Sequence, residues 1–357
     1  MMNINRLTSL ISRINDEYSG TTGTLMEVCG THTNAIRKLG IHRLLPNGIK
    51  LLSGPGCPVC VTGSGYIEQG IKLCRSSDIT ITTFGDLLKV PGNTGTLTEA
   101  RADGGKVRII YSPLDAVELA RVNPNQEFIF LGVGFETTAP VIALAVKTAK
   151  EEGIKNFSVL PALKVLKPAL EALLNDNSLK INGLIAPGHL SVITGAKAFA
   201  FLPEHYKLPT VITGFQAEEI WLGIAALLAQ LKNDRIELEN MYPQAVSDEG
   251  NLEAQQLIRE IFKEEDTEWR GLGTIAASGL GFSKEYRDFD ARIRFQLPVI
   301  KSIEPAGCLC GTILLGKAQP EECPHFGSGC LPEHPVGPCM VSSEGTCAAH
   351  FHYRSIV

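Results

Sequence analysis

The sequence predicts an α/β protein with two similar lobes of parallel sheet that face a cleft, followed by a smaller cysteine-rich C-terminal domain. Short β-rich runs alternate with amphipathic helical stretches through the first 240 residues, which is typical of parallel sheets covered by helices. Two stretches within this region resemble each other, as duplicated lobes would. Six of the 10 cysteines follow residue 307, in a segment rich in glycine and proline.

Eight short runs rich in β-branched and apolar residues are expected to be strands. They are Thr24–Val28, Ile49–Leu52, Ile79–Thr83, Val107–Tyr111, Phe128–Gly132, Phe157–Leu160, Ile181–Ala186 and Thr210–Thr213. Ser112 precedes Pro113 and has Asp115 at capping-box distance, which predicts the start of a helix. Gly153 is expected to end the helix that begins near Ala139.

The two lobes are expected from an internal repeat. A Pro-Gly turn within 54–63 aligns with one within 186–195, and each follows a strand and opens a helix. The upstream loops at 29–33 and 134–138 also match in kind. Because open parallel sheets present their functional loops at the carboxyl ends of the strands, four such loops should surround one cleft.

The repeat and the change in composition predict four segments. The first lobe is expected over 21–122 and the second over 123–240. An N-terminal helix over 1–20 is expected to pack on the C-terminal domain, which is assigned to 241–357 and opens with a polar helix at 251–264. With few long apolar runs, this last domain is expected to need a metal to hold its fold.

The composition describes a globular protein and excludes several kinds of partner. With 357 residues and a hydrophobic fraction of 44%, the chain can bury sizeable cores. The net charge of −5 is mild and no Lys/Arg cluster stands out, which argues against nucleic acid and against a polybasic membrane segment. Proteins and small ligands are the expected partners.

The expected location is the cytoplasm. Residues 1–18 lack the uninterrupted apolar core and cleavage site of a secretory signal. The longest strongly apolar stretch, around Trp221–Leu231, is shorter than the ~20 residues that span a bilayer. Ten cysteines in a reducing compartment favour metal binding or redox chemistry over structural disulfides.

A Cys-x-x-Cys pair, Cys57 and Cys60, falls between a strand and a helix. The amides at a helix N-terminus favour negative charge and lower the pKa of a thiol. Such a pair can be a dithiol/disulfide couple or a metal clamp. Because glycines and prolines fix a tight turn around the pair, the sulfurs are expected to be presented rather than buried.

A second motif places Cys29 beside His32 after the first strand. Cys29 is either a buried cysteine at the end of a strand or a functional thiol opposite the Cys-x-x-Cys turn. With Cys57 and Cys60 it would make a three-thiolate site that suits Fe(II), Cu(I) or Zn. Cys74, by contrast, lies on an apolar helical stripe and is interpreted as core.

Several polar residues are candidates for proton transfer in the cleft. Glu136 lies in the 134–138 loop and is either a solvated loop acid or a proton carrier. His32, His189 and Asp86 are candidates of the same kind, each with an ordinary structural reading beside the functional one.

The C-terminal segment holds six cysteines, which are Cys308, Cys310, Cys323, Cys330, Cys339 and Cys347. Their spacing is not the paired Cys-x-x-Cys spacing of a zinc ribbon. Glycine and proline turns around them can wrap a cluster, which favours a 4Fe-4S centre over zinc. The histidines of this segment are possible ligands, but the preferred interpretation is that they are surface or packing residues; they are His325, His334, His350 and His352.

Five ordered motifs carry a resemblance to a known family. They are Cys-Gly-Thr-His-Thr at 29–33, Gly-Pro-Gly-Cys-Pro-Val-Cys at 54–60, Gly-Phe-Glu-Thr-Thr at 134–138, Pro-Gly-His at 187–189 and Cys-Met-Val-Ser-Ser-Glu-Gly-Thr-Cys-Ala-Ala at 339–349. With these motifs the chain resembles the HypD family of hydrogenase maturation proteins over essentially its whole length. The resemblance implies a scaffold on which the Fe(CN)2CO group of NiFe hydrogenase is assembled, with redox-active thiols and a 4Fe-4S cluster.

The resemblance also implies partners and roles. A small HypC-type chaperone would hold the iron with this chain, a HypE-type protein would donate cyanide, and the hydrogenase large subunit would be served indirectly. Cys29 would be the iron ligand shared with the HypC-type partner, and Cys57 and Cys60 would be the redox-active or iron-binding pair. Electrons could pass from the cluster to that pair. The expected cluster ligands are Cys310, Cys323, Cys330 and Cys347, with Cys308 and Cys339 as alternatives.

Rival functions remain open from the sequence alone. In an iron–sulfur-dependent thiol/disulfide reductase acting on proteins, Cys57 and Cys60 would do the chemistry and Cys29 would be core. A nucleotide-dependent enzyme would need an unrecognised site, because no Gly-x-x-x-x-Gly-Lys-Ser/Thr run is present. A radical enzyme is disfavoured because the Cys-x-x-x-Cys-x-x-Cys spacing is absent, and a structural zinc module leaves the strand-end motifs unexplained.

Overall fold

The strands pair into two sheets within residues 4–354, the part of the chain that this computed structural model describes. The first sheet is parallel throughout, in the order β2 (Ile49–Ser53), β1 (Gly23–Glu27), β7 (Gly183–Pro187), β8 (Thr210–Thr213) and β9 (Leu238–Asn240). The second has the order β10 (Phe262–Trp269), β11 (Gly273–Phe282), β6 (Phe157–Lys164), β5 (Glu127–Gly134), β3 (Ile79–Thr83) and β4 (Val107–Ile109). Its β3, β4, β5 and β6 are parallel, and β11 and β10 add an antiparallel edge. The predicted α/β architecture with parallel sheets is confirmed.

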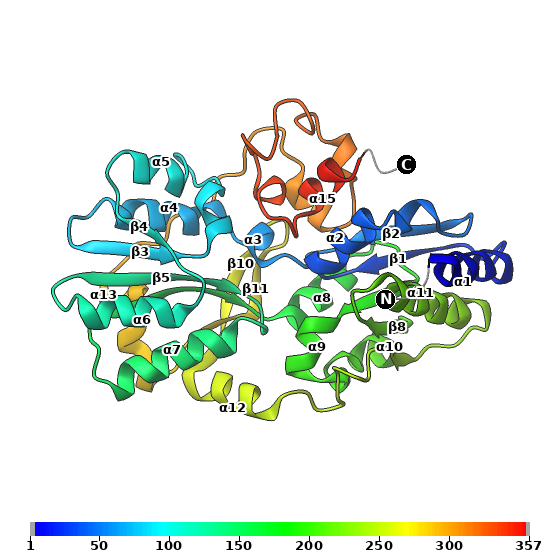
Figure 1. The fold of residues 1–357 in the computed structure, drawn as a ribbon, viewed down its shortest axis with the longest axis horizontal. Coiled ribbons are helices and arrows are strands. Elements are labelled where there is room, and N and C mark those ends of the chain that lie inside the picture. Colours follow the sequence, from blue (N-terminus) through cyan, green and yellow to red (C-terminus); the bar gives the residue numbers. More distant parts are fainter. Residues whose placement is uncertain (1–3, 355–357) are drawn as a thin grey trace.

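Helices connect successive strands and cover the sheets (Figure 1). Their bounds are α1 Ile4–Glu17, α2 Gly30–Lys38, α3 Pro58–Val61, α4 Ser64–Cys74, α5 Leu97–Ala102, α6 Pro113–Val122, α7 Ala139–Glu151, α8 Leu166–Leu174, α9 Gly188–Thr194, α10 Phe201–Tyr206, α11 Ala217–Lys232, α12 Leu252–Ile261, α13 Ala291–Arg294, α14 Cys310–Leu314 and α15 Thr346–His352. In Figure 1, α4 and α5 lie on one side of the second sheet and α6 and α7 on the other.

Local sequence signals predict these elements well. Each of the eight expected strands is present, with ends that differ by a few residues. Ser112 accepts a hydrogen bond from Leu114 N at 3.2 Å and Asp115 accepts one from Ser112 N at 2.9 Å, so the predicted capping box is confirmed. Gly153 adopts φ +68 directly beyond α7, as expected of a helix-ending glycine. The polar helix expected over 251–264 ends at Ile261, because a strand with alternating burial begins at the next residue.

The sheets divide the chain differently from the lobes expected over 21–122 and 123–240. β1 pairs with β7 through Leu25↔Gly183, so strands from the second half complete the sheet that the first half begins. β3 and β4 join β5 and β6 in the other sheet. Residues 262–282 of the segment expected over 241–357 also belong to the second sheet, because β10 and β11 extend it. Interior strands need a hydrogen-bonded neighbour on each edge, and these neighbours are distant in sequence.

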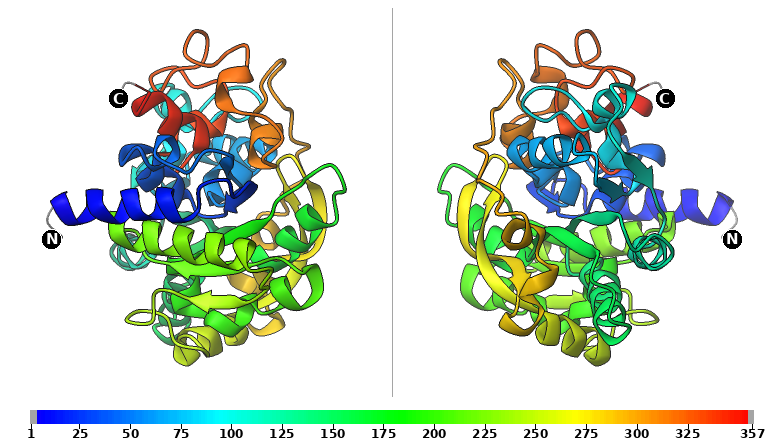
Figure 2. Two further views of the ribbon diagram at one scale, coloured as in Figure 1. Left: turned by 90° about the vertical axis from the view of Figure 1, so that its right-hand side faces the viewer. Right: turned by 90° about the vertical axis from the view of Figure 1, so that its left-hand side faces the viewer.

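The two ends of the described chain pack on the first sheet's side of the molecule. α1 lies on α11 and shares with it a core that includes Ile14, Tyr18 and Trp221, rather than packing on the C-terminal segment as expected. The segment from about residue 305 to 354 covers α2 and α3, and Figure 2 shows it at one side of the molecule from two directions. This segment therefore forms a roof over the residues that follow β1 and β2.

Apolar side chains fill the space between helices and sheets. Trp221 of α11 lies under the first sheet, and Phe130 and Phe157 lie between the second sheet and its helices. Burial is continuous along β3 and β7, as expected of parallel strands covered on both faces. Among the described residues, no helix is both long enough and apolar enough to cross a membrane.

Candidate functional site

All four predicted strand-end loops meet at one small cavity. It has a volume of about 210 Å³, and its walls come from the ends of β1, β2, β5 and β7 together with the C-terminal segment. Its lining includes Cys29, Pro58, Thr137, His189 and Glu344. The prediction that these loops surround a single site is confirmed, although they divide between the sheets differently from the predicted repeat.

Cys29 occupies the wall of this cavity at the start of α2. Its backbone N–H donates to Glu27 Oε2 at 2.9 Å, and Thr33 Oγ1 donates to Glu27 Oε1 at 2.5 Å. The Cys29 residue is 8% exposed, and burial raises the pKa of its thiol to about 12. Burial also raises the pKa of Glu27 to about 7. The site therefore offers a single thiol held in place by a buried carboxyl group.

Sequence reasoning missed Glu27, although a signal was present. An acid stands inside the apolar run Leu25-Met26-Glu27-Val28, where its side chain must face a sheet surface. A buried carboxyl group is costly unless it accepts hydrogen bonds, so such an acid marks a fixed polar contact.

Glu344 reaches the cavity from the C-terminal segment and was not predicted either. Thr31 Oγ1 donates to Glu344 Oε1 at 2.7 Å, and Asn34 Nδ2 donates to Ser343 O at 2.8 Å. Gly30 leaves no room for a side chain, because an added Cβ would lie 2.4 Å from Glu344 Cβ. The roof is thus docked directly on the first turn of α2.

His32 and His189 stack on the same aromatic ring. The His32 ring lies 4.5 Å from the Phe215 centroid and the His189 ring 3.9 Å from it, both at small interplanar angles. Rings this close to one phenyl group must lie on its opposite faces. His32 Nε2 is 2.9 Å from Gly214 O. Burial lowers the pKa of His32 to about 4 and lowers the pKa of His189 as well, so both imidazoles are neutral, and only His189 lines the cavity.

Glu136 lies behind the cavity rather than in its wall. Its Oε1 accepts a hydrogen bond from Leu166 N at 3.0 Å, and its buried Oε2 has no partner. Burial raises the pKa of this carboxyl group to about 7. Glu136 instead lines a second groove of about 510 Å³, while its neighbours Phe135 and Thr137 line the Cys29 cavity. Asp86 is exposed and lines neither space.

Cys57 and Cys60 lie beneath the roof. Cys57 is the N-cap of α3, its Sγ accepts from Cys60 N at 3.3 Å, and the two Sγ atoms are 2.7 Å apart. The prediction that these sulfurs are presented is wrong, because Cys57 and Cys60 are only 3% and 0% exposed. The Gly/Pro turn forms as expected, but Pro338 O lies 3.9 Å from Cys60 Sγ and residues 338–340 cover α3.

The two thiols of this pair are not equivalent. Burial raises the pKa of Cys57 well above its usual value. Burial alone would also raise the pKa of Cys60, but hydrogen bonds with the Cys339 and Cys57 thiols outweigh it and lower that pKa to about 6. Of the two thiols, Cys60 therefore has the lower pKa.

Sulfur contacts continue from Cys60 into the C-terminal segment. The Sγ atoms of Cys310 and Cys339 are 2.7 Å apart, and the neighbouring thiols of Cys310, Cys347 and Cys60 raise the pKa of Cys339. Cys310 thus pairs with a cysteine outside its predicted ligand set.

The remaining cysteines of the segment form a second neighbourhood. Cys308 interacts electrostatically with Cys310, Cys323 and Cys347, and Cys347 interacts with Cys310 and Cys330. No three Cys, His, Asp or Glu side chains converge as a metal site among residues 4–354. Cys74 is 1% exposed in the core, as predicted.

The fold and the site together define a class of protein. It is an α/β protein with two parallel-dominated sheets and a buried thiol where the loops of the two sheets meet. A cysteine-rich roof places further sulfurs next to the helix that carries the Cys-x-x-Cys pair. The family follows from sequence comparison. A family model described as "HypD: Hydrogenase formation hypA family" matches residues 4–354, and the chain belongs to this family.

Curated relatives agree with this assignment. The chain is 39% identical over 353 residues to the hydrogenase maturation factor HypD of Rhodobacter capsulatus, covering 96% of this chain and 93% of the relative. It is 40% identical over 331 residues to HypD of Escherichia coli (strain K12), covering 92% and 89%. It is 41% identical over 336 residues to HypD of Azotobacter vinelandii, again covering 92% and 89%. The resemblance inferred from the motifs is confirmed.

Proposed function

We propose that this chain is a hydrogenase maturation factor that binds iron through Cys29 while cyanide and carbon monoxide are attached to the metal. The iron is cargo, to be passed on to a NiFe hydrogenase. A HypC-type chaperone would share the iron through a cysteine of its own, and a HypE-type protein would supply cyanide. The cytoplasm, a reducing compartment, suits a chain whose cysteines are all free thiols.

The observation that carries this proposal is the convergence of four strand-end loops on one cavity with a single cysteine in its lining. A thiolate is a suitable ligand for iron, and binding the metal would replace the proton that burial keeps on Cys29. One sulfur leaves most iron coordination positions free for cyanide, carbon monoxide and a partner's ligand. The neutral His189 and the hydroxyl of Thr137 line the same space and could hydrogen-bond ligands on the iron.

Cys57 and Cys60 are proposed as a redox pair rather than as primary iron ligands. Their sulfurs lie close enough to form a disulfide after a small movement, and neither lines the cavity. Cys29 is nevertheless on the adjoining turn, since Gly30 N donates to Gly56 O at 3.1 Å. Electrons held by this pair would therefore be available beside the iron.

The C-terminal cysteines fit a 4Fe-4S cluster in number and kind, and we propose Cys308 instead of Cys310 as one ligand. Cys308 interacts electrostatically with Cys323 and Cys347, and Cys347 with Cys330; Cys310 interacts with Cys308 and Cys347 as well, but its Sγ lies only 2.7 Å from that of Cys339. Binding would require the four side chains to turn toward a common centre, because no such centre is preformed among the described residues. A bound cluster would supply single electrons, and the close Cys310–Cys339 pair lies between its ligands and Cys60.

The rival reductase function is disfavoured by burial. A reductase acting on protein disulfides must expose its attacking sulfur, because the attack forms a mixed disulfide with the substrate. Cys60, whose thiol has the lower pKa of the pair, is 0% exposed under the roof, and Cys57 is 3% exposed. Electrons from this pair are better suited to a reaction inside the molecule than to a protein substrate.

Infrared spectroscopy tests the proposal. The full-length chain, co-expressed anaerobically with HypC-type and HypE-type partners, should show cyanide and carbonyl stretches, and Cys29→Ala should lose them. Cys74→Ala is the matched control, because Cys74 is a buried core cysteine remote from the cavity lining. Equal bands in the native chain and Cys29→Ala would rule out Cys29 as the iron ligand.

A further inference from the structure

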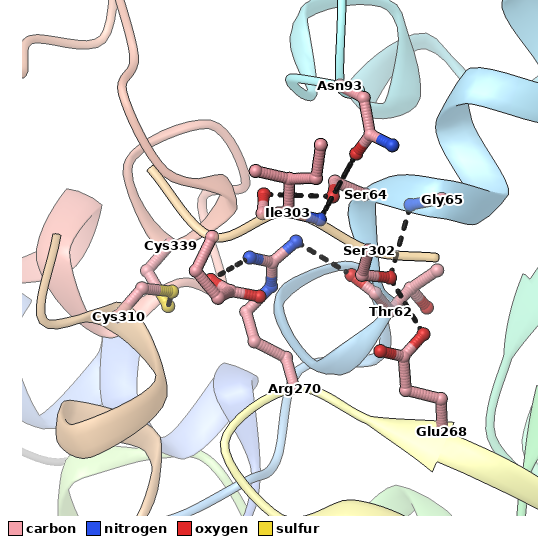
Figure 3. Close-up of polar contacts among 11 residues, drawn as sticks. Thr62, Ser64, Gly65, Asn93, Glu268, Arg270, Ser302, Ile303, Cys310 and Cys339 are labelled. Atoms are coloured by element: carbon pink, nitrogen blue, oxygen red, sulfur yellow. Dashed lines mark hydrogen bonds and ion pairs between the residues drawn. The ribbon is translucent and has the colours of Figure 1, made fainter. Parts of the chain in front are cut away.

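A fully buried guanidinium group, that of Arg270, lies in the same region as the Cys310–Cys339 pair and bonds to Thr62 just beyond the helix of Cys60 (Figure 3). The side chain of Arg270 is 1% exposed and forms an ion pair with Glu304, whose side chain is 49% exposed. Arg270 Nη2 also donates to Thr62 O at 3.2 Å, and its buried Nε has no partner among the described residues. The cation is thus withdrawn from water while its carboxylate partner remains half in solvent.

The turn that carries Arg270 lies between the segment of Cys57 and Cys60 and the segment of Cys310 and Cys339. Arg270 N donates to Val61 O at 2.9 Å, at the end of α3, the helix that carries Cys60. On the other side, Gly271 adopts φ +83 and lies so close to Gly311 that an added Cβ would be 2.7 Å from Gly311 O. Gly311 directly follows Cys310 at the start of α14. The β10–β11 turn therefore contacts the segments of both sulfur pairs.

The charge of Arg270 lies beside the end of the helix that carries Cys60. Burial alone would lower the pKa of Arg270, but its ion pair with Glu304 is among the interactions that hold this pKa above its usual value. Arg270 in turn contributes to lowering the pKa of Cys60. A buried cation costs several kcal/mol in desolvation, and a half-exposed carboxylate compensates for that only in part. If Arg270 stabilises an anionic sulfur, that stabilisation explains why a buried cation is found at this position.

We propose that Arg270 is a positioning residue that raises the reduction potential of the Cys57–Cys60 pair. The inference rests on the proposed redox role of these two thiols. Reduction of their disulfide by a dithiol transfers two electrons, breaks the protein S–S bond and forms the disulfide of the reductant. The two released sulfurs take up protons or remain as thiolates. A fixed positive charge beside them favours the thiolate, and therefore the reduced state.

Redox titration of the full-length chain tests this inference. The protein is equilibrated anaerobically with mixtures of reduced and oxidised dithiothreitol, the free thiols are alkylated, and the state of the Cys57–Cys60 pair is read by peptide mass spectrometry. In Arg270→Gln the equilibrium constant for reduction should fall at least tenfold, which is a shift of about 30 mV to more negative potential for a two-electron couple. Arg270→Lys retains the charge and should shift less.

Glu304→Gln is the matched control with the opposite expected sign. It leaves Arg270 in place and removes the carboxylate that offsets its charge, so the potential should become more positive. A purely structural role of this ion pair would shift both variants in the same direction, and that result would overturn the inference. Glu304→Gln and Arg270→Lys carry the test if Arg270→Gln does not fold.

The same titration separates failure of the inference from failure of the proposed function. If the Cys57–Cys60 pair of the native chain does not convert between disulfide and dithiol, the proposed redox role fails and the inference fails with it. If the pair converts normally and Arg270→Gln has the native potential, only the role of Arg270 is refuted.

Discussion

Replacing Glu136 with glutamine should make the free energy of unfolding less dependent on pH. The carboxyl group lies at the edge of the 510 Å³ groove, with one oxygen bonded to Leu166 N and the other buried without a partner. Burial raises its pKa from the ordinary value of 4.5 to about 7. Because the folded state keeps its proton in this range and the unfolded state releases it, stability falls as pH rises from about 4.5 to about 7.

The size of this effect follows from the pKa difference. Each unit of difference is worth about 1.4 kcal/mol, so the full shift corresponds to roughly 3 kcal/mol, of which about 2.5 kcal/mol falls between pH 5 and 8. In Glu136→Gln the amide oxygen still accepts from Leu166 N and no proton is released. The variant should therefore gain about 2.5 kcal/mol relative to the native chain on going from pH 5 to pH 8.

Urea unfolding at both pH values, under reducing anaerobic conditions, measures this difference. Glu204→Gln serves as the control, because Glu204 lines the same groove with an exposed side chain and should leave the pH dependence unchanged. A stability difference between Glu136→Gln and the native chain that is the same at pH 5 and pH 8 would refute the argument. Glu136 would then ionise normally in the folded protein.

Three further variants test contacts around the site. Gly30→Ala should lower the free energy of unfolding by ~1–3 kcal/mol, because its Cβ would collide with Glu344, and amide hydrogen exchange in residues 342–347 should become faster. Unchanged exchange would show that the position of the roof does not depend on this contact. Phe215→Ala should lower the free energy of unfolding by roughly 2–3 kcal/mol and move the pKa of His189 toward its usual value, which an NMR titration measures. An unchanged His189 pKa would contradict the stacking argument. Cys308→Ser should lose cluster iron and sulfide on anaerobic analysis whereas Cys310→Ser should retain them, and the reverse pattern would restore Cys310 as the ligand.

Local sequence determined the parts of the fold that could be predicted. β-rich runs, capping residues and helix-ending glycines act within a few residues, so strands such as Ile79–Thr83 and the start of α6 are predictable. The pairing of β1 with β7 is not, because it joins residues far apart in the chain, with Thr24 N donating to Asn182 Oδ1 across the two segments. Strand order depends on which distant edges fit together, and no local signal encodes that choice.

The candidate site likewise has parts that the sequence predicts and parts that it does not. The loops at Cys29 and His189 were predictable, because each follows a strand and parallel strands present their carboxyl ends together. The burial of Cys60 was not, since residues 338–340 cover it from a distant part of the sequence. Arg270 and Glu27 also escaped prediction, because a charged residue in a turn or strand looks solvated until its surroundings are known.

Mössbauer spectroscopy of the 57Fe-enriched full-length chain, expressed with its HypC-type partner, tests the central claim that Cys29 binds the cargo iron. The native complex should contain a mononuclear iron signal in addition to any cluster signal. In Cys29→Ala the mononuclear signal should disappear while the cluster signal remains. Retention of the mononuclear signal in Cys29→Ala would contradict the account and move the iron site away from the cavity where the strand-end loops meet.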